Sequence, residues 1–254
     1  MADSVFDSRK PAFPRQEMKK APGIQFEHQP GRSIFQLKDP GSAITHFIGL
    51  VLAILATPPL LIHGAGQGMT LLQLAALSVF LLSMVGLYAA STTYHALNLP
   101  GKGNKALKKL DHTMIFFLIA GTYTPICLTA LAGHGGEGLL LKVWTVALGG
   151  TVLKQLWVTH PKWLSSVLYI GMGWLCLTEL PSLVTRMERT GFLWLLAGGV
   201  FYTVGGVIYA LKLKIFNSRH KRFGSHAVFH LFVMGGSFCH YIVMYCWVAD
   251  MAIS

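Results

Sequence analysis

The chain has 254 residues, of which 53% are hydrophobic and only 12% are charged. Soluble globular proteins carry roughly 25% charged residues, so this composition excludes an ordinary soluble domain and indicates an integral membrane protein. The net charge of +11 does not indicate a nucleic-acid partner, because the basic residues lie between apolar runs too long for a nucleic-acid-binding domain. We expect membrane lipids as the partners of this chain.

The chain divides into a polar N-terminal arm, residues 1–41, and an apolar remainder, residues 42–250. We expect the arm to be disordered and cytoplasmic. A bilayer core of about 30 Å requires about 20 apolar residues per helix, and seven windows of that length follow the arm. In chain order the predicted spans are Ser42–His63, Leu71–Leu97, Leu110–Leu131, Leu139–Thr159, Leu164–Thr185, Gly191–Leu213 and Gly224–Val248. Their short connections predict an all-α, seven-transmembrane helical bundle with no soluble domain between the spans.

Lysine and arginine are distributed unequally between the two sides of this predicted bundle. Of the 21 basic residues, eighteen lie in the arm or in the second, fourth and sixth connections, and three (Lys142, Arg186 and Arg189) lie on the other side. By the positive-inside rule, the N-terminus is cytoplasmic and the C-terminus lies outside. We expect the protein in the plasma membrane.

The positions of the cysteines and glycines in the sequence indicate that these residues have structural roles. The four cysteines form no CxxC pair and lie inside apolar runs, so neither a disulfide framework nor a zinc ribbon is indicated. Pairs of glycines at 149–150, 198–199, 205–206 and 235–236 predict close approach of neighbouring helices.

Ionisable side chains are costly inside a membrane, and four of them gather at one predicted depth near the cytoplasmic side. His95 lies near the end of the second span, Asp111 begins the third, and His226 and His230 begin the seventh. The spacing of His226 and His230 places both on one helix face, with Cβ atoms about 5–6 Å apart, which suits two ligands of one metal. Three imidazoles and one open position are the ligands of a catalytic zinc, which lowers the pKa of bound water to about 7. The sequence therefore predicts a zinc site at His95, His226 and His230.

Asp111 and Ser91 are the candidate catalytic residues beside this metal. The segment from His226 to His230 lacks the glutamate of the H-E-x-x-H metalloproteases, so an acid from another helix must hold the water or act as general base. Asp111 is placed for that role, and Ser91 can hydrogen-bond a ligand or the substrate carbonyl. Each residue alone also has an ordinary explanation: packed histidines, an N-cap aspartate, or a serine bonded to a backbone carbonyl. Their coincidence at one depth favours the metal site.

Four other ionisable groups are not predicted to bind the metal. His46 begins the first span at the same depth, and both lining the site and lying at the interface stay open for it. His112 points about 100° away from the neighbouring aspartate and is interpreted as interfacial. His240 lies about 15 Å beyond the second ligand histidine of its span, too far for the same metal. Glu179 lies toward the outer end of the fifth span, where it pairs with a polar group or reaches outward.

Four motifs carry a resemblance to a known family: Ser42-x-x-x-His46, Ser91-Thr-Thr-Tyr-His95, Leu110-Asp111-His112-Thr113, and His226-x-x-x-His230 followed by His240. With them the sequence resembles the hemolysin III family, within the progestin and adipoQ receptor (PAQR) group of seven-span membrane proteins, over roughly Asp39 to Val248. The group includes the adiponectin receptors and is similar to the alkaline ceramidases, in which three histidines bind zinc and an aspartate interacts through water.

The resemblance implies the same site residues. His95, His226 and His230 correspond to the zinc ligands, Asp111 to the water-orienting acid or base, and Ser91 to a supporting or oxyanion partner. The family often has an acidic residue and Asn ahead of the first-span histidine. Here the sequence from Asp39 to Ser42 replaces that pattern, which leaves a catalytic role of the first-span histidine open.

Several functions use these residues. The first is a zinc-dependent hydrolase of a lipid amide or ester, with Asp111 managing the proton and Ser91 stabilising the oxyanion. The second is a non-enzymatic sensor or regulator of membrane lipids, in which a zinc closed by a fourth protein ligand only ties helices together. A cytolytic pore rests on the family's name alone and lacks a polar-lined span, and a b-type haem lacks a second matching histidine pair. The sequence favours the hydrolase and leaves the lipid and the oligomeric state open.

Overall fold

Helices account for every regular element of the described residues. The computed structural model describes residues 37–156, 162–211 and 224–253. In chain order its elements are α1 (Pro40–Gly66), α2 (Leu71–Ala96), α3 (Gly101–Leu128), α4 (Gly136–Leu156), α5 (Lys162–Gly173), the 3₁₀ helix η1 (Leu175–Glu179), α6 (Leu180–Arg186), α7 (Arg189–Leu211), α9 (Ser225–Val243), the π-helical turn η2 (Met244–Val248) and the 3₁₀ turn η3 (Asp250–Ile253). The predicted all-α class is confirmed.

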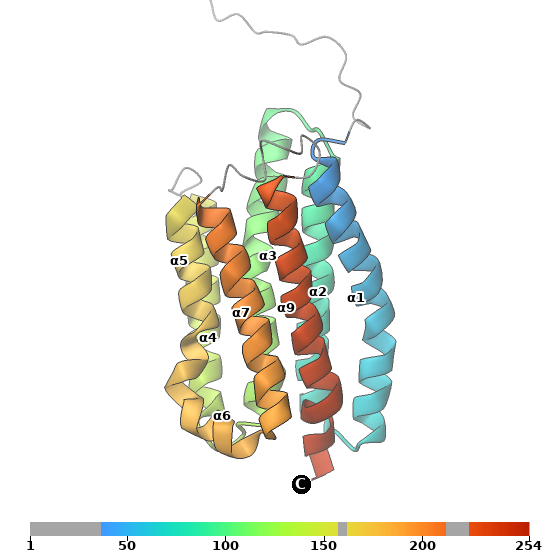
Figure 1. Ribbon diagram of the computed structural model, residues 1–254, viewed down its shortest axis with the longest axis vertical. Helices are drawn as coiled ribbons and strands as arrows, with labels where there is room; N and C mark the ends of the chain where they lie inside the picture. Colours follow the sequence, from blue (N-terminus) through green and yellow to red (C-terminus); the bar gives the residue numbers. More distant parts are fainter. Residues whose placement is uncertain (1–36, 157–161, 212–223, 254) are drawn as a thin grey trace, which may run out of the picture. The chain divides into compact units, whose positions relative to one another are not determined.

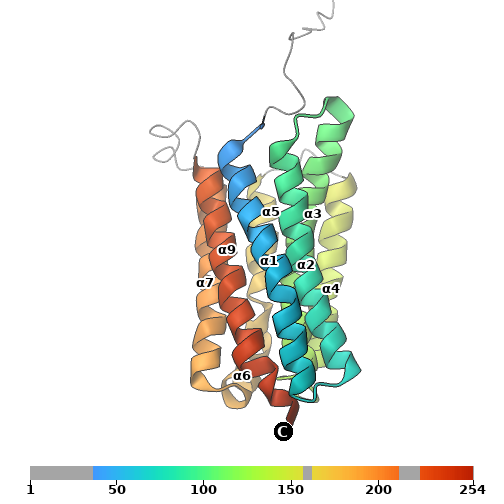
Figure 2. The same ribbon diagram turned by 90° about the vertical axis from the view of Figure 1, so that its right-hand side faces the viewer.

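Neighbours in sequence are mostly neighbours in space within this bundle (Figures 1 and 2). Helix α2 packs against both α1 and α3, α4 packs on α3, and α7 pairs with α9. Helix α1 also contacts α9, which brings the first and last long helices together, while α5 packs chiefly on α7. The end of α2 and the beginnings of α1, α3 and α9 therefore meet at one end of the bundle.

Six helical segments of the described residues are long and apolar enough to cross a membrane. They are Pro40–Gly66, Leu71–Ala96, Gly136–Leu156, Trp163–Arg186, Arg189–Leu211 and Ser225–Val248. Helix α3 contacts α2 and α4 but begins with a lysine-rich stretch and is not among the six. The chain is an all-α membrane protein, and its seven spans and their orientation stay predictions.

The helix that contains the third predicted span begins before that span. Helix α3 starts at Gly101 rather than at Leu110, so the lysine-rich stretch forms its first turns. Pro100 occupies the position just before the helix, where a missing backbone N–H is tolerated. The apolar window thus marks only the inner part of a longer helix.

The fifth predicted span is not one continuous helix. It is broken into α5, η1 and α6. The hydroxyl of Tyr123 supplies hydrogen bonds at the break, because it donates to the Gly173 carbonyl at 2.6 Å and accepts from the Cys176 N–H at 3.0 Å. Backbone groups released from a helix at membrane depth require such partners, so α3 holds the irregular segment in place.

Part of the predicted organisation lies outside the described residues. This applies to residues 1–36 of the N-terminal arm, to the end of the fourth predicted span at Thr159, to the end of the sixth at Leu213, and to the basic residues between positions 212 and 222.

The glycine pairs lie where helices pack closely. One member of each pair faces a neighbouring side chain: Gly150 faces Phe116, Gly198 faces His240, Gly205 faces Phe232 and Gly236 faces Tyr202, and a Cβ atom at any of them would lie within 2.8 Å of that side chain. The predicted role of these glycines in helix packing is confirmed.

Candidate functional site

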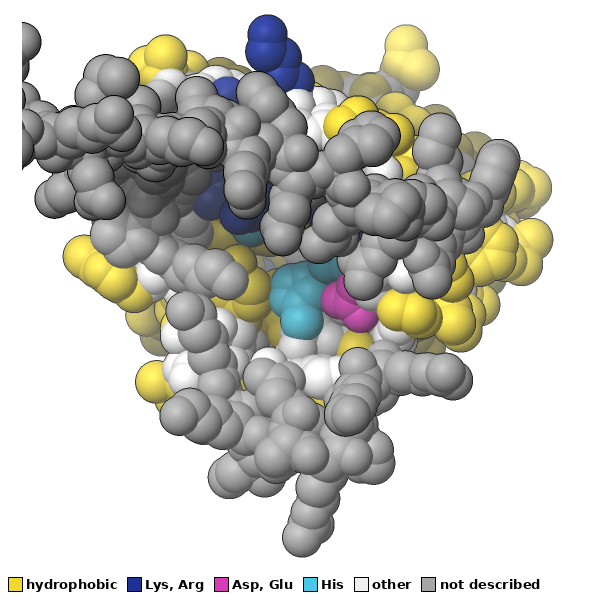
Figure 3. Space-filling model, turned by 90° about the horizontal axis from the view of Figure 1, so that it is seen from above, with side chains coloured by type: hydrophobic (Ala, Val, Ile, Leu, Met, Phe, Trp, Pro, Cys, Tyr) yellow, Lys and Arg dark blue, Asp and Glu magenta, His cyan; other side chains and the backbone are white. Residues whose placement is uncertain are grey.

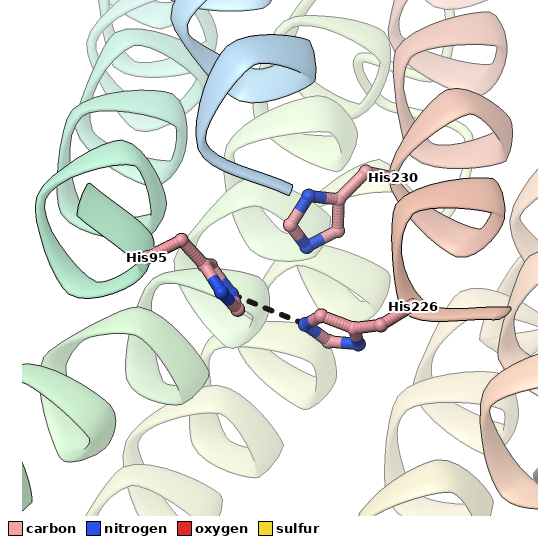
Figure 4. A group of neighbouring side chains, drawn as sticks. All are labelled: His95, His226 and His230. Atoms are coloured by element: carbon pink, nitrogen blue, oxygen red, sulfur yellow. Dashed lines mark hydrogen bonds between the residues drawn. The ribbon is translucent and has the colours of Figure 1, made fainter. Parts of the chain in front are cut away.

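Three histidines converge at the end of the bundle where α2 ends and α9 begins (Figure 4). His95 occupies the last turn of α2, and His226 and His230 occupy the first turns of α9. Their candidate ligand nitrogens all lie within 4.8 Å of one another. Nitrogen donors gathered in this way are suited to one metal ion. The residues predicted as ligands thus form a cluster that can hold a metal ion.

The nitrogens of His95 and His226 have nearly the separation that two ligands of one ion require. Their Nε2 atoms lie 3.1 Å apart. Two nitrogens that each lie about 2.0–2.1 Å from a tetrahedral zinc are about 3.3 Å from each other. This pair of nitrogens is therefore spaced for one zinc ion, and the three ligand nitrogens together lie within 4.8 Å.

In His230 and His95, the ring nitrogen Nδ1, on the other side of the ring from Nε2, lies near an oxygen atom of α1 or of the residue before it. Nδ1 of His230 is hydrogen-bonded to the Ser42 carbonyl oxygen at 3.2 Å. Nδ1 of His95 has no hydrogen-bond partner among the described residues but lies 3.5 Å from Oδ2 of Asp39, at ion-pair distance. A carbonyl or carboxylate oxygen favours a proton on the nitrogen that faces it. Both rings then keep the lone pair of Nε2 free, as a metal-ligating histidine requires.

His46 of α1 lies beside the cluster but not as a fourth ligand. Its ring stacks on that of His230 with 3.5 Å between centroids and 8° between planes. A metal lies in the plane of the imidazole that binds it, so two parallel stacked rings cannot share one ion. His46 is 2% exposed, and neither ring nitrogen has a hydrogen-bond partner among the described residues. Of the two positions that the sequence left open, the structure places His46 in the site.

Asp111 and Ser91 lie at the same end of the bundle. Asp111 is buried, and its Oδ2 lies 3.3 Å from Nδ1 of His112. Ser91 is fully buried one turn before His95, and its side chain interacts with the carboxyl group of Asp111. The hydroxyl and the carboxyl group therefore lie together at this end of the bundle.

His112 differs from its predicted interfacial position. Its Nδ1 also lies 2.9 Å from the Lys108 carbonyl oxygen, its Nε2 lies 3.4 Å from the Tyr209 hydroxyl, and its ring lines the cavity described below. The reason is that α3 has neighbours on several sides. The ring of His112 therefore contacts both its neighbour Asp111 and Tyr209 of α7.

A long cavity leads from these polar side chains into the bundle. At the site end its wall includes Ser91, Asp111, His226 and His230, and most of the remaining wall is apolar. Its lining residues on α3 extend from Asp111 to Ile126, a helix length of about 22 Å. Figure 3 looks onto the site end and shows histidine and acidic side chains next to one another near its centre. An apolar cavity with polar groups gathered at one end suits an amphipathic ligand.

Two further groups lie apart from the cluster. His240, predicted to lie too deep for the same metal, places its Nε2 3.3 Å from the Leu195 carbonyl oxygen. It is not in the group of three histidines found among the described residues. Glu179 pairs with Lys142 at 3.8 Å.

Comparison with known proteins identifies the family. The family model described as "Haemolysin-III related" matches residues 35–241. The chain belongs to this family. Hemolysin-3 of Bacillus cereus is 40% identical over 203 residues, which cover 80% of this chain and 88% of that protein. The Hemolysin-3 homolog of Bacillus subtilis is 38% identical over 218 residues, or 84% of this chain and 97% of that protein.

A more distant relative links the haemolysin-III-related chain to the PAQR group. The human monocyte to macrophage differentiation factor is 27% identical over 172 residues, which cover 66% of this chain and 68% of that protein. The family assignment made from the four motifs is therefore confirmed.

Sequence reasoning missed one neighbour of the cluster and left another open. Asp39 was noted only as a departure from the family pattern, and His46 was not placed. The motif Ser42-x-x-x-His46 repeats the spacing of Ser91 and His95, but the spacing alone does not say which other helix the histidine faces. The contact of α1 with α9, which decides the matter, is not visible in the sequence.

Proposed function

We propose that this haemolysin-III-related chain is a zinc-dependent hydrolase that cleaves an amide or ester bond of a membrane lipid. The observation that carries the proposal is the position of three convergent histidines at the polar end of a long apolar cavity. His95, His226 and His230 would hold the zinc. When bound at such a site, zinc polarises a carbonyl group and lowers the pKa of a coordinated water to about 7.

The chain's own residues supply the proton transfer and the charge stabilisation. A carboxylate oxygen of Asp111 takes a proton from the attacking water and later returns it to the departing amine or alcohol. Nδ1 of His112, 3.3 Å from Oδ2, holds this carboxylate in place. The Ser91 hydroxyl, which is buried beside Asp111, donates to the carbonyl oxygen as it gains negative charge.

The cavity accounts for a lipid substrate. Its length of about 22 Å along α3 exceeds the thickness of one leaflet's hydrocarbon, which is about half of a 30 Å core. In this proposal an extended acyl chain lies along the apolar wall, and the bond to be cleaved lies at the site end. With the N-terminus in the cytoplasm, that end lies at the cytoplasmic leaflet.

An open fourth ligand position favours catalysis over a purely structural zinc. Among the described residues the group that can hold a metal consists of three histidines, and His46 stacks on one of them instead of joining them. Structural zinc sites are closed by a fourth protein ligand. The alternative, a lipid sensor or regulator whose zinc only joins helices, therefore has less support.

The test uses the full-length, zinc-loaded protein in vesicles that contain a long-chain N-acyl amide or a long-chain glycerol ester, with released fatty acid as the readout. We expect release by the wild type. The Asp111→Asn variant should keep its zinc but lose about 10²–10⁴-fold in rate, because a general base is removed.

Asp250→Asn is the matched control for this variant. Asp250 also pairs with a histidine, His63 at 3.1 Å, but at the other end of the bundle, so its loss should leave hydrolysis unchanged. Absence of release from both lipid classes by the zinc-loaded wild type would contradict the proposal, as would equal rates for the wild type and Asp111→Asn.

A further inference from the structure

The first turn of α1 contacts two of the three clustered histidines, although these come from different helices. The Ser42 carbonyl oxygen lies 3.2 Å from Nδ1 of His230 on α9. On the other side, Oδ2 of Asp39 lies 3.5 Å from Nδ1 of His95 on α2. Both contacts are made on the ring nitrogen that faces away from the cluster. The start of α1 thus orients rings on both sides of the site.

Asp39 is held in position by the backbone as well as by its side chain. Its N–H donates to the His95 carbonyl oxygen at 3.0 Å, and its Oδ1 accepts from the Ser42 N–H at 3.5 Å as the N-cap of α1. One carboxylate therefore caps a helix with one oxygen and faces an imidazole with the other. An N-cap alone needs only one acceptor oxygen, and Asn or Ser serves equally well.

Lys38 fixes the same segment to α2 and α3. Its Nζ lies 3.4 Å from the centroid of the Tyr94 ring, 3.2 Å from the Tyr94 carbonyl oxygen and 2.9 Å from Oδ1 of Asn104. These contacts keep the residue before Asp39 against the helix that carries His95. Asp39 is therefore not free to turn away from the imidazole.

The Asp39 side chain carries a negative charge at neutral pH. An aspartate side chain is ordinarily ionised at pH 7, because its usual pKa is about 3.9. A carboxylate that faces the outer nitrogen of a ligand histidine fixes the proton there and makes the inner nitrogen a better donor. Removal of such a partner typically weakens metal binding about 10–100-fold.

We propose that Asp39 is a positioning residue of the metal centre, which holds His95 with its proton on Nδ1 and its Nε2 lone pair toward the metal. The proposal rests on the proposed function only in that His95 binds the metal. Asp39 touches neither the ion nor the substrate. Its effect is exerted through the orientation and basicity of one imidazole.

The experiment compares zinc affinity, measured by competition with a chelator, in the wild type, Asp39→Asn and Asp39→Ser. Both variants keep an N-cap side chain, so the metal-free protein should unfold at the wild-type temperature. We expect about tenfold weaker zinc binding in Asp39→Asn, at the lower end of the range for such partners, and at least as large a loss in Asp39→Ser. The visible spectrum of the cobalt(II)-substituted protein should also change, because it reports the ligand field directly.

Asp250→Asn, which removes the carboxylate of the aspartate–histidine pair at the opposite end of the bundle, should bind zinc as the wild type does. Unchanged zinc affinity and an unchanged cobalt spectrum in both Asp39 variants would overturn the proposal while leaving the hydrolase intact. A lower unfolding temperature of both metal-free variants, with the same loss of zinc in Asp250→Asn, would also overturn it, since the role would then be structural. A wild type that binds no zinc would instead overturn the proposed function itself.

Discussion

Burial does not distinguish the clustered histidines from the other histidines inside the bundle. His46, His230 and His240 are all less than 10% exposed, yet of these only His230 belongs to the convergent group. Ring direction makes the difference. His240 directs its Nε2 to a backbone carbonyl, whereas the ring of His46 lies parallel to that of His230.

This difference predicts that His46 can be replaced without loss of the metal. In His46→Phe, an aromatic ring of similar shape keeps the stack on His230, and no ligand is removed. We expect the purified variant to contain about as much zinc per chain as the wild type. A zinc-free His46→Phe protein of unchanged unfolding temperature would show that His46 is a ligand, contrary to the ring geometry.

The candidate ligands could be predicted from the sequence because the features that reveal them lie within single helices. The spacing of His226 and His230 indicates a shared helix face, and the cost of ionisable groups in a membrane draws attention to His95 and Asp111. Asp39 gives no such signal, because an Asp-Pro pair ahead of an apolar run reads as a helix start. Its contact with His95 joins residues from two helices and appears only once α1 and α2 are packed.

At the scale of single elements, α4 depends on its glycines to approach α3. Gly150 is buried against the ring of Phe116, and a Cβ atom there would lie 2.4 Å from that ring. Phe116 is itself 1% exposed and packs edge-on against Tyr169 at 4.7 Å, so it has no space into which to move. Gly149, the preceding residue, has no atom within 4 Å of such a Cβ.

This pair of neighbours gives a matched prediction. Gly150→Val should destabilise the protein by about 1–3 kcal/mol, the usual cost of forcing a larger side chain into a packed interior. Gly149→Val, which makes the same change in helix propensity on the open face, should have little effect. The unfolding temperature of the two variants in the same detergent measures the difference, and equal values would contradict the packing of α4 on α3.

The apolar windows predicted most helices closely and failed where helix formation does not depend on apolarity. The second window, Leu71–Leu97, nearly coincides with α2 (Leu71–Ala96). The third missed the start of α3 because a lysine-rich stretch can be helical without being apolar. The fifth missed the break after Gly173, which stays apolar in sequence and depends on the hydroxyl of Tyr123 on another helix.

At the scale of the whole molecule, the distribution of lysine and arginine between the two ends of the bundle predicts the side of the membrane on which the site lies. Lys38 and the lysines at the start of α3 lie at the end of the bundle that holds the three histidines. Three basic residues, Lys142, Arg186 and Arg189, belong to the other end. The positive-inside rule therefore predicts that the site end faces the cytoplasm.

This orientation predicts which terminus a protease can reach. A cleavable tag at the N-terminus should be removed only in inside-out membrane vesicles, and the same tag at the C-terminus only in right-side-out vesicles. Cleavage of both tags from one side would mean an even number of spans. The reverse pattern would place the site at the outer leaflet.

The zinc content of the purified full-length protein tests the central claim most directly. We predict about one zinc per chain in the wild type and in a control variant that lacks two histidines outside the cluster, His63→Ala with His134→Ala. The variant His226→Ala with His230→Ala should contain none, because two of three ligands are removed. Zinc retained in that variant, or absent from a wild type that has been supplied with zinc, would contradict the assignment of this cluster as a metal centre.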